Sequence, residues 1–90
     1  MTESQLKMKV QRYLKNIDAF SMKISDRFSS GIPDMCIVFK GRTIWIELKT
    51  PTGVVSAIQD YHIKEINRHC GEAYVVRSLE RLKEILHVES

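Results

Sequence analysis

The segment from Gly31 to Lys49 constrains the fold most, because it holds two short apolar runs joined by a tight connection. The runs MCIVF at 35–39 and TIWIELK at 43–49 are rich in the β-branched and aromatic residues that favour strands. Between them, Lys40-Gly41-Arg42 provides a glycine where a turn needs a positive φ. Pro33 cannot donate to a sheet ladder, so the first strand begins only after it. The segment therefore predicts a β-hairpin.

The register of this hairpin decides which side chains share a face. We place the turn at Gly41-Arg42, which sets Asp34 opposite Lys49. Since side chains alternate along a strand, Asp34, Glu47 and Lys49 then lie on one face. The other face takes six apolar residues, namely Met35, Ile37, Phe39, Ile44, Ile46 and Leu48. A three-residue turn would set Asp34 opposite Leu48, on the wrong face, so we prefer the first register.

Helices are predicted on both sides of the hairpin. Thr2 and Gln5 form a capping-box pattern, and apolar residues then recur at helical spacing over about residues 3–16. Ser56 and Gln59 repeat that pattern before a second helix over 57–70. We expect Gly71 to cap the end of this second helix.

Two further strands and a last helix complete the order. Residues 19–28 alternate in part and predict a first strand, and AYVV at 73–76 predicts a short apolar one. Ser78 then caps a final helix with the stripe Leu79, Leu82, Ile85 and Leu86. The expected order is α-β-β-β-α-β-α.

Composition indicates one domain over residues 1–90, with 43% hydrophobic and 28% charged residues. No apolar run approaches the roughly 20 residues that span a bilayer, and the N-terminus lacks the apolar core of a signal peptide. We therefore expect a cytoplasmic protein without a membrane segment. Cys36 and Cys70 match neither a metal spacing nor a disulfide framework, so both are expected to be free thiols.

Basic residues concentrate in the first half of the chain, where residues 1–50 carry nine Lys/Arg against five Asp/Glu. The first predicted helix contributes four of them, Lys7, Lys9, Arg12 and Lys15. This helix surface is either an ordinary solvated face or a patch that faces the phosphates of a nucleic acid.

The hairpin charges suggest a chemical function. Two carboxylates a few ångströms apart repel each other when both are ionised, so a divalent cation is a natural neutraliser. Oxygen ligands favour Mg²⁺ or Mn²⁺ over zinc, since no thiolate or imidazole joins Asp34 and Glu47. A nearby lysine, Lys49, can orient water or stabilise developing negative charge, which suits phosphodiester hydrolysis. The alternative is that Asp34 is a turn residue and that Glu47 and Lys49 form a weak ion pair on a wet face.

Three motifs together resemble a known family. GIPD at 31–34, IELK at 46–49 and SAIQDYH at 56–62 look like the PD-(D/E)xK nuclease pattern, in particular its virus-type replication-repair nuclease (VRR-NUC) branch. The resemblance covers nearly the whole chain. It implies an α/β (α+β) fold with a restriction-endonuclease-like core, in which helices flank a central mixed sheet.

The resemblance also implies roles for individual residues. Asp34 and Glu47 would bind the metal, together with the backbone carbonyl of Leu48 and the carboxylate of Glu3 on the first helix. Lys49 would be the catalytic lysine. Gln59 would support the site, although its place in the capping box is an equally good explanation of it.

Beyond these motifs, Lys23, Arg27 and Lys40 flank the predicted site and are candidates for DNA contacts. The implied activity is that of a Mg²⁺- or Mn²⁺-dependent DNA endonuclease. Stand-alone VRR-NUC proteins resemble this case, which implies a homodimer, often phage-encoded, that acts on branched DNA such as four-way (Holliday) junctions. Three alternatives stay open: a general endonuclease, a nucleic-acid-binding module that retains the fold, and a structural domain.

Candidate dimer surfaces are the helix over 57–70 and the last helix, with Ile63, Leu82 and Leu86. The alternative is that the same apolar stripes are simply part of the core.

Overall fold

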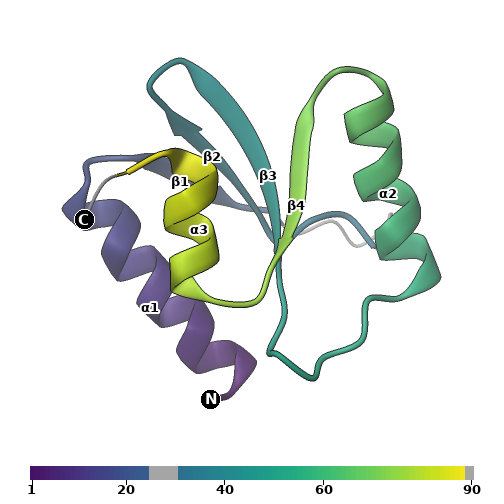
Figure 1. Cartoon of the computed structure of the whole chain (residues 1–90), viewed down its shortest axis with the longest axis horizontal. Coiled ribbons are helices and arrows are strands. Elements are labelled where there is room, and N and C mark those ends of the chain that lie inside the picture. Colours follow the sequence, from purple (N-terminus) through teal and green to yellow (C-terminus); the bar gives the residue numbers. More distant parts are fainter. Residues whose placement is uncertain (25–30, 89–90) are drawn as a thin grey trace.

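The computed structural model describes residues 1–24 and 31–88 (Figure 1). Its elements, in chain order, are α1 (Glu3–Asn16), β1 (Phe20–Lys23), β2 (Met35–Phe39), β3 (Arg42–Leu48), α2 (Ala57–Arg68), β4 (Glu72–Val76) and α3 (Leu79–Leu86). The predicted order α-β-β-β-α-β-α is confirmed. The first strand is shorter than predicted, since Ala19 precedes it and Ile24 follows it. Residues 25–28 of that prediction lie outside the described residues.

The four strands form one mixed sheet in the order β1-β2-β3-β4. The pairs β1/β2 and β2/β3 are antiparallel, whereas β3 and β4 are parallel. A parallel pair needs a crossover, and α2 provides it. Figure 1 shows α1 and α3 together on one side of the sheet and α2 on the other side, beside β4.

The core lies between the sheet and the pair α1 and α3. The sheet contributes the apolar face predicted for the hairpin, from β2 and β3, and the buried Val76 from β4. The two helices contribute Leu6, Val10, Leu14, Leu82, Ile85 and Leu86. All six hairpin residues assigned to the inner face are buried: Met35, Ile37, Phe39, Ile44, Ile46 and Leu48. The predicted faces of the hairpin are therefore confirmed.

The predicted register of the hairpin is wrong by two residues. Phe39 pairs with Arg42 and Cys36 with Trp45, so the turn is Lys40-Gly41 and not Gly41-Arg42. Both turn residues have positive φ, 50° for Lys40 and 79° for Gly41. Two successive positive φ values match the right-handed twist of the strands, which is the reason such turns dominate short hairpins. A shift of two residues leaves every side chain on its predicted face.

The prediction that Gly71 caps α2 is also wrong, because another residue takes the capping conformation. The residue after the α2 C-cap that adopts a positive φ is Cys70, at 65°. Gly71 is required for another reason, because a Cβ there would lie 2.7 Å from Cγ2 of Ile66. Its amide donates to the Ile66 carbonyl at 2.9 Å, which closes the end of the helix.

The apolar stripe of α3 belongs to the core, since Leu82 and Leu86 are 0% and 2% exposed. These leucines therefore cannot form a dimer surface in this fold. Ile63 on α2 is half-buried, and within the described part of the chain α2 contributes no fully buried residue.

Both cysteines are free thiols, as predicted, with Cys36 buried and Cys70 exposed. Among the described helices, none combines the length and the apolar character that a bilayer crossing requires.

Candidate metal centre

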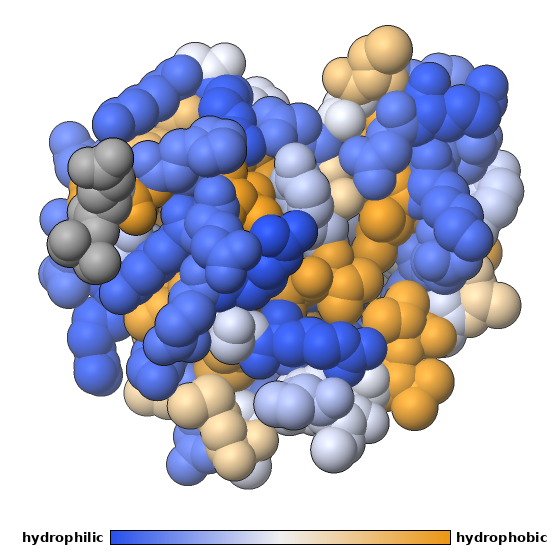
Figure 2. Space-filling view, in the orientation of Figure 1, coloured by the Kyte–Doolittle hydropathy of each residue, from blue (hydrophilic) through white to orange (hydrophobic). Residues whose placement is uncertain are grey.

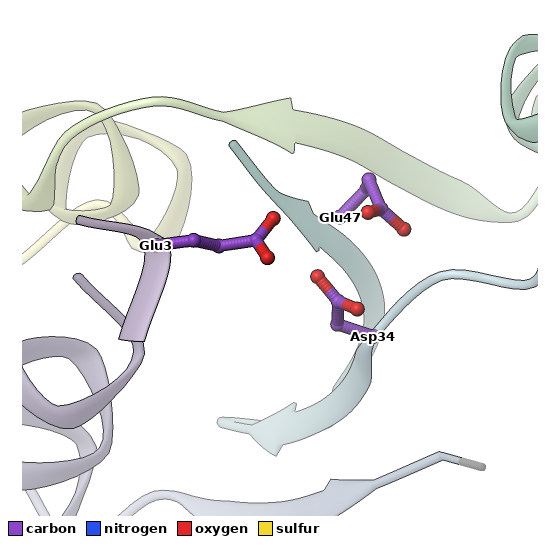
Figure 3. A group of neighbouring side chains, drawn as sticks. All are labelled: Glu3, Asp34 and Glu47. Carbon is purple, nitrogen blue, oxygen red and sulfur yellow. The ribbon is translucent and has the colours of Figure 1, made fainter. Parts of the chain in front are cut away.

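Three carboxylates from three separate parts of the chain meet at one end of the sheet. Glu3 begins α1, Asp34 directly precedes β2 and Glu47 lies near the end of β3. Continuing the observed register by one step sets Asp34 opposite Glu47, where the sequence placed Lys49. One oxygen of each carboxylate lies within 4.8 Å of the others. Figure 3 shows the three side chains converging on a common point.

Glu47 is the buried member of this group, with 2% of its surface exposed. Gln59 Nε2 donates to Glu47 Oε2 at 3.3 Å, and Lys49 Nζ lies 3.8 Å from the same oxygen. The other oxygen, Oε1, is buried and has no hydrogen-bond partner among the described residues. Burial, followed by the nearby charge of Asp34, raises the pKa of Glu47 from 4.5 to about 7.

Asp34 is fixed by a backbone contact. Its Oδ2 accepts a hydrogen bond from the Leu48 amide at 2.9 Å, which ties the start of β2 to the end of β3. The Lys49 amide in turn donates to the Val76 carbonyl at 3.1 Å, so β4 holds the same segment from the other side. Backbone hydrogen bonds of the sheet therefore tie the Asp34 carboxylate to the end of β3, which carries Glu47. The role of the Leu48 carbonyl as a metal ligand stays a prediction.

Gln59 makes contacts that fit both roles that the sequence left open. Its Oε1 accepts from the Ser56 amide at 2.9 Å and its own amide donates to Ser56 Oγ at 3.2 Å, which completes the capping box. Its Nε2 remains free to reach Glu47. The first turn of α2 is thereby connected directly to the carboxylate cluster.

Lys7, which the sequence places only on a basic surface, lies beside the carboxylate cluster. Its Nζ lies 3.7 Å from Asp34 Oδ1 and 4.0 Å from Glu3 Oε2. Spacing along the helix indicates the contact with Glu3, four residues before it, but the approach of α1 to Asp34 is a tertiary feature.

The structure places the three candidate DNA-contact residues differently. Lys23 lies beside the site, where it lines a small cavity together with Asp34. Lys40 lies in the hairpin turn, about 20 Å along the strand from Asp34, with its ammonium 5.3 Å from the centre of the Phe39 ring. The structure therefore does not bring Lys40 to the site. Arg27 lies outside the described residues.

The donor chemistry of the cluster fits a hard divalent cation. All three candidate donors are carboxylates, and oxygen ligands of this kind suit Mg²⁺ or Mn²⁺ better than zinc. A bound cation would also give the buried Glu47 Oε1 the partner that the described residues do not provide. Glu3, at the exposed edge, leaves one side of the cluster open to solvent.

The fold has a close counterpart among solved structures. A chain described as a VRR_NUC domain superposes with a TM-score of 0.83 and covers 100% of both chains. The chain has a VRR-NUC fold. The predicted restriction-endonuclease-like fold class is thereby confirmed, and the 15% sequence identity restricts this likeness to the fold. Neither the family models nor the curated proteins give a match to this sequence.

Proposed function

We propose that this protein is a metal-dependent DNA endonuclease that hydrolyses phosphodiester bonds. One observation carries the proposal: three carboxylate oxygens lie within 4.8 Å of one another, next to the Lys49 ammonium, on a VRR-NUC fold. Burying a carboxylate such as Glu47 beside another acid costs stability, so a functional reason for the arrangement is expected.

Asp34 and Glu47 would hold a Mg²⁺ or Mn²⁺ ion, with Glu3 and the Leu48 carbonyl as further candidate ligands. When bound, the cation supplies Lewis-acid chemistry and neutralises negative charge that develops in the reaction. Gln59 would keep Glu47 in position through its hydrogen bond of 3.3 Å.

Lys49 would act on the reacting phosphate. Attack of water on phosphorus adds negative charge to the phosphoryl oxygens before one P–O bond of the backbone breaks. The Lys49 side chain is only 16% exposed, so its charge acts in a partly desolvated site, where electrostatic stabilisation is stronger than in water. We assign to Lys49 the stabilisation of this charge and the orientation of the attacking water.

We extend the proposal to branched DNA, in particular four-way junctions, cut by a homodimer. The support is the likeness of the fold to a VRR_NUC domain. A twofold dimer would present two sites to two strands.

One contact favours a second candidate, a nucleic-acid-binding module without catalysis. Lys7 lies 3.7 Å from Asp34 and 4.0 Å from Glu3, and it can offset part of the negative charge of the cluster without a metal. Turnover separates the two candidates.

The test is cleavage of an end-labelled four-way junction, a linear duplex and a single strand, with Mg²⁺, Mn²⁺ or EDTA. We expect metal-dependent cutting by the wild type and by Lys64→Ala, whose lysine pairs with Asp60 on the surface of α2. Lys49→Ala should lose at least about 100-fold in rate, the usual effect of removing one group that stabilises charge in the transition state. Binding of DNA without cutting under any metal condition would favour the binding module.

A further inference from the structure

A groove runs between α1 and β1 and opens into the carboxylate cluster. Its inner part is a cavity of about 50 Å³ that includes Asp34, and its outer part is a cavity of about 400 Å³. Gln11, Lys23 and Met35 line both parts, so the two lie next to each other. We call this feature the α1–β1 groove and define it by Lys7, Gln11, Lys15, Ser21, Lys23 and Met35.

The walls of the groove follow from helix and strand geometry. Lys7, Gln11 and Lys15 are spaced by four residues, so they form a row along α1 of about 12 Å. Opposite this row, Lys23 pairs with Met35, whose side chain belongs to the core beneath α1. Cross-strand partners share a face, so the Lys23 side chain lies on the same side of the sheet as the helix.

The charge of the groove changes along its length. Of the described lining residues, Asp34 at the inner end is the acidic one. Lys15 and Lys23 have no carboxylate oxygen within 4.0 Å among residues 1–24 and 31–88. Figure 2 shows that hydrophilic residues dominate the surface over α1. The charge of the outer groove therefore suits an anion, whereas the inner end leads to the carboxylate cluster.

The residues that define the groove include no aromatic ring for stacking on a base. Phe20 touches the outer cavity, but it pairs with Val38, which faces away from α1, and both side chains are exposed on that other face. Apart from Met35, the side chains that define the groove end in ammonium, amide and hydroxyl groups, which can bind phosphate oxygens without regard to sequence.

We propose that the α1–β1 groove binds the phosphodiester backbone of the DNA strand that is to be cut. Lys15 and Lys23 contact phosphates next to the scissile one, and Lys7 contacts the strand where the groove meets the cluster. The row on α1 matches the axial length of about three nucleotides of one strand. This inference rests on the proposed nuclease function for the position of the scissile phosphate, and the two probes of the test distinguish the backbone of a single strand from that of a duplex.

The test measures binding without cleavage, in EDTA, with a labelled single strand and a labelled blunt duplex as probes. The test variant is Lys15→Gln/Lys23→Gln. The matched control is Lys9→Gln/Lys64→Gln, which removes the same charge from the α1 surface beside Met8 and Arg12 and from the exposed face of α2. Lys15→Arg/Lys23→Arg keeps the charge and tests whether the lysines act as cations.

We expect the test variant to bind the relevant probe about 30-fold more weakly at about 0.1 M salt, with a slope of log K against log salt that falls by about 1.4 to 1.8. The control variant should keep the wild-type slope, and the Arg variant should keep most of the affinity. If the test variant loses affinity only for the single-stranded probe, the groove binds unpaired DNA. If it loses affinity for the duplex probe, the groove binds paired DNA.

Equal weakening in the test and control variants on both probes would overturn the proposal, as would a wild type that binds neither probe. The result is independent of catalysis. If the wild type binds through the groove but cuts nothing with Mg²⁺ or Mn²⁺, the nuclease proposal fails and the groove stands. Circular dichroism of each variant confirms that the protein is folded.

Discussion

Glu47→Gln should stabilise the metal-free protein, because the structure buries this carboxylate without a full set of partners. Glu47 is 2% exposed and its Oε1 has no partner among the described residues. Its pKa rises from 4.5 to about 7 on folding, so the folded state favours the protonated acid. Between pH 4.5 and about pH 7, the folded state therefore keeps a proton on Glu47 that the unfolded state has lost. The free energy of unfolding falls as the pH rises through this range.

The size of the effect follows from the two pKa values. A change from 4.5 to about 7 corresponds to about 3 kcal/mol of folding free energy, which is lost by about pH 8. Gln has the shape of Glu without the charge and can still accept the hydrogen bond from Gln59. We therefore expect Glu47→Gln to raise the free energy of unfolding by about 2 to 3 kcal/mol at about pH 8 in EDTA, and by less than about 0.5 kcal/mol at about pH 4.

The assay is urea denaturation followed by circular dichroism at both pH values. Glu84→Gln is the control, since Glu84 lies on the exposed face of α3 in a surface ion pair with Arg81 and its loss should cost less than about 1 kcal/mol. An equal or lower stability of Glu47→Gln at about pH 8 would refute the reasoning, because burial of the charge would then carry no cost.

Three further predictions follow from the same contacts. Mg²⁺ or Mn²⁺ should raise the midpoint of thermal unfolding of the wild type at about pH 8, because an ion that binds the folded state alone stabilises that state. The midpoint of Asp34→Asn/Glu47→Gln should not change. An equal shift in both proteins would place the ion elsewhere. Gln59→Ala should lower the free energy of unfolding in urea by about 1 to 2 kcal/mol and should also lower the cleavage rate. The control Gln5→Ala removes the matching capping box of α1 and should lower stability alone. An equal loss of activity in the two variants would contradict a role for Gln59 in the site. Ile46→Ala should cost about 2 to 5 kcal/mol in the same unfolding assay, because Ile46 is fully buried in β3 and its removal leaves a cavity; a cost below about 1 kcal/mol would contradict the assigned core.

The hairpin shows what alternation in a sequence can and cannot predict. It predicted correctly which residues of β2 and β3 face the core, because that depends only on odd and even positions. It did not predict the register, since a shift of two residues preserves the same faces. The structure resolves this through a positive φ at Lys40, a conformation that few residues other than glycine adopt.

The candidate site was predictable where it lies on adjacent strands. Asp34, Glu47 and Lys49 were brought together by strand pairing alone, and the true register places the first two closer than expected. Lys7 was not predictable as a site residue, because its contact with Asp34 depends on how the start of α1 approaches the end of the sheet. Local spacing carries no information on that approach.

The measurement that tests the central claim most directly is a cleavage time course of a labelled four-way junction with Mg²⁺ or Mn²⁺, using the wild type and Glu47→Gln at about pH 8. We predict that the wild type cuts and that Glu47→Gln, although it is the more stable protein, does not. Cutting by Glu47→Gln at the wild-type rate would contradict the account, because the buried carboxylate would then be neither a metal ligand nor a catalytic group.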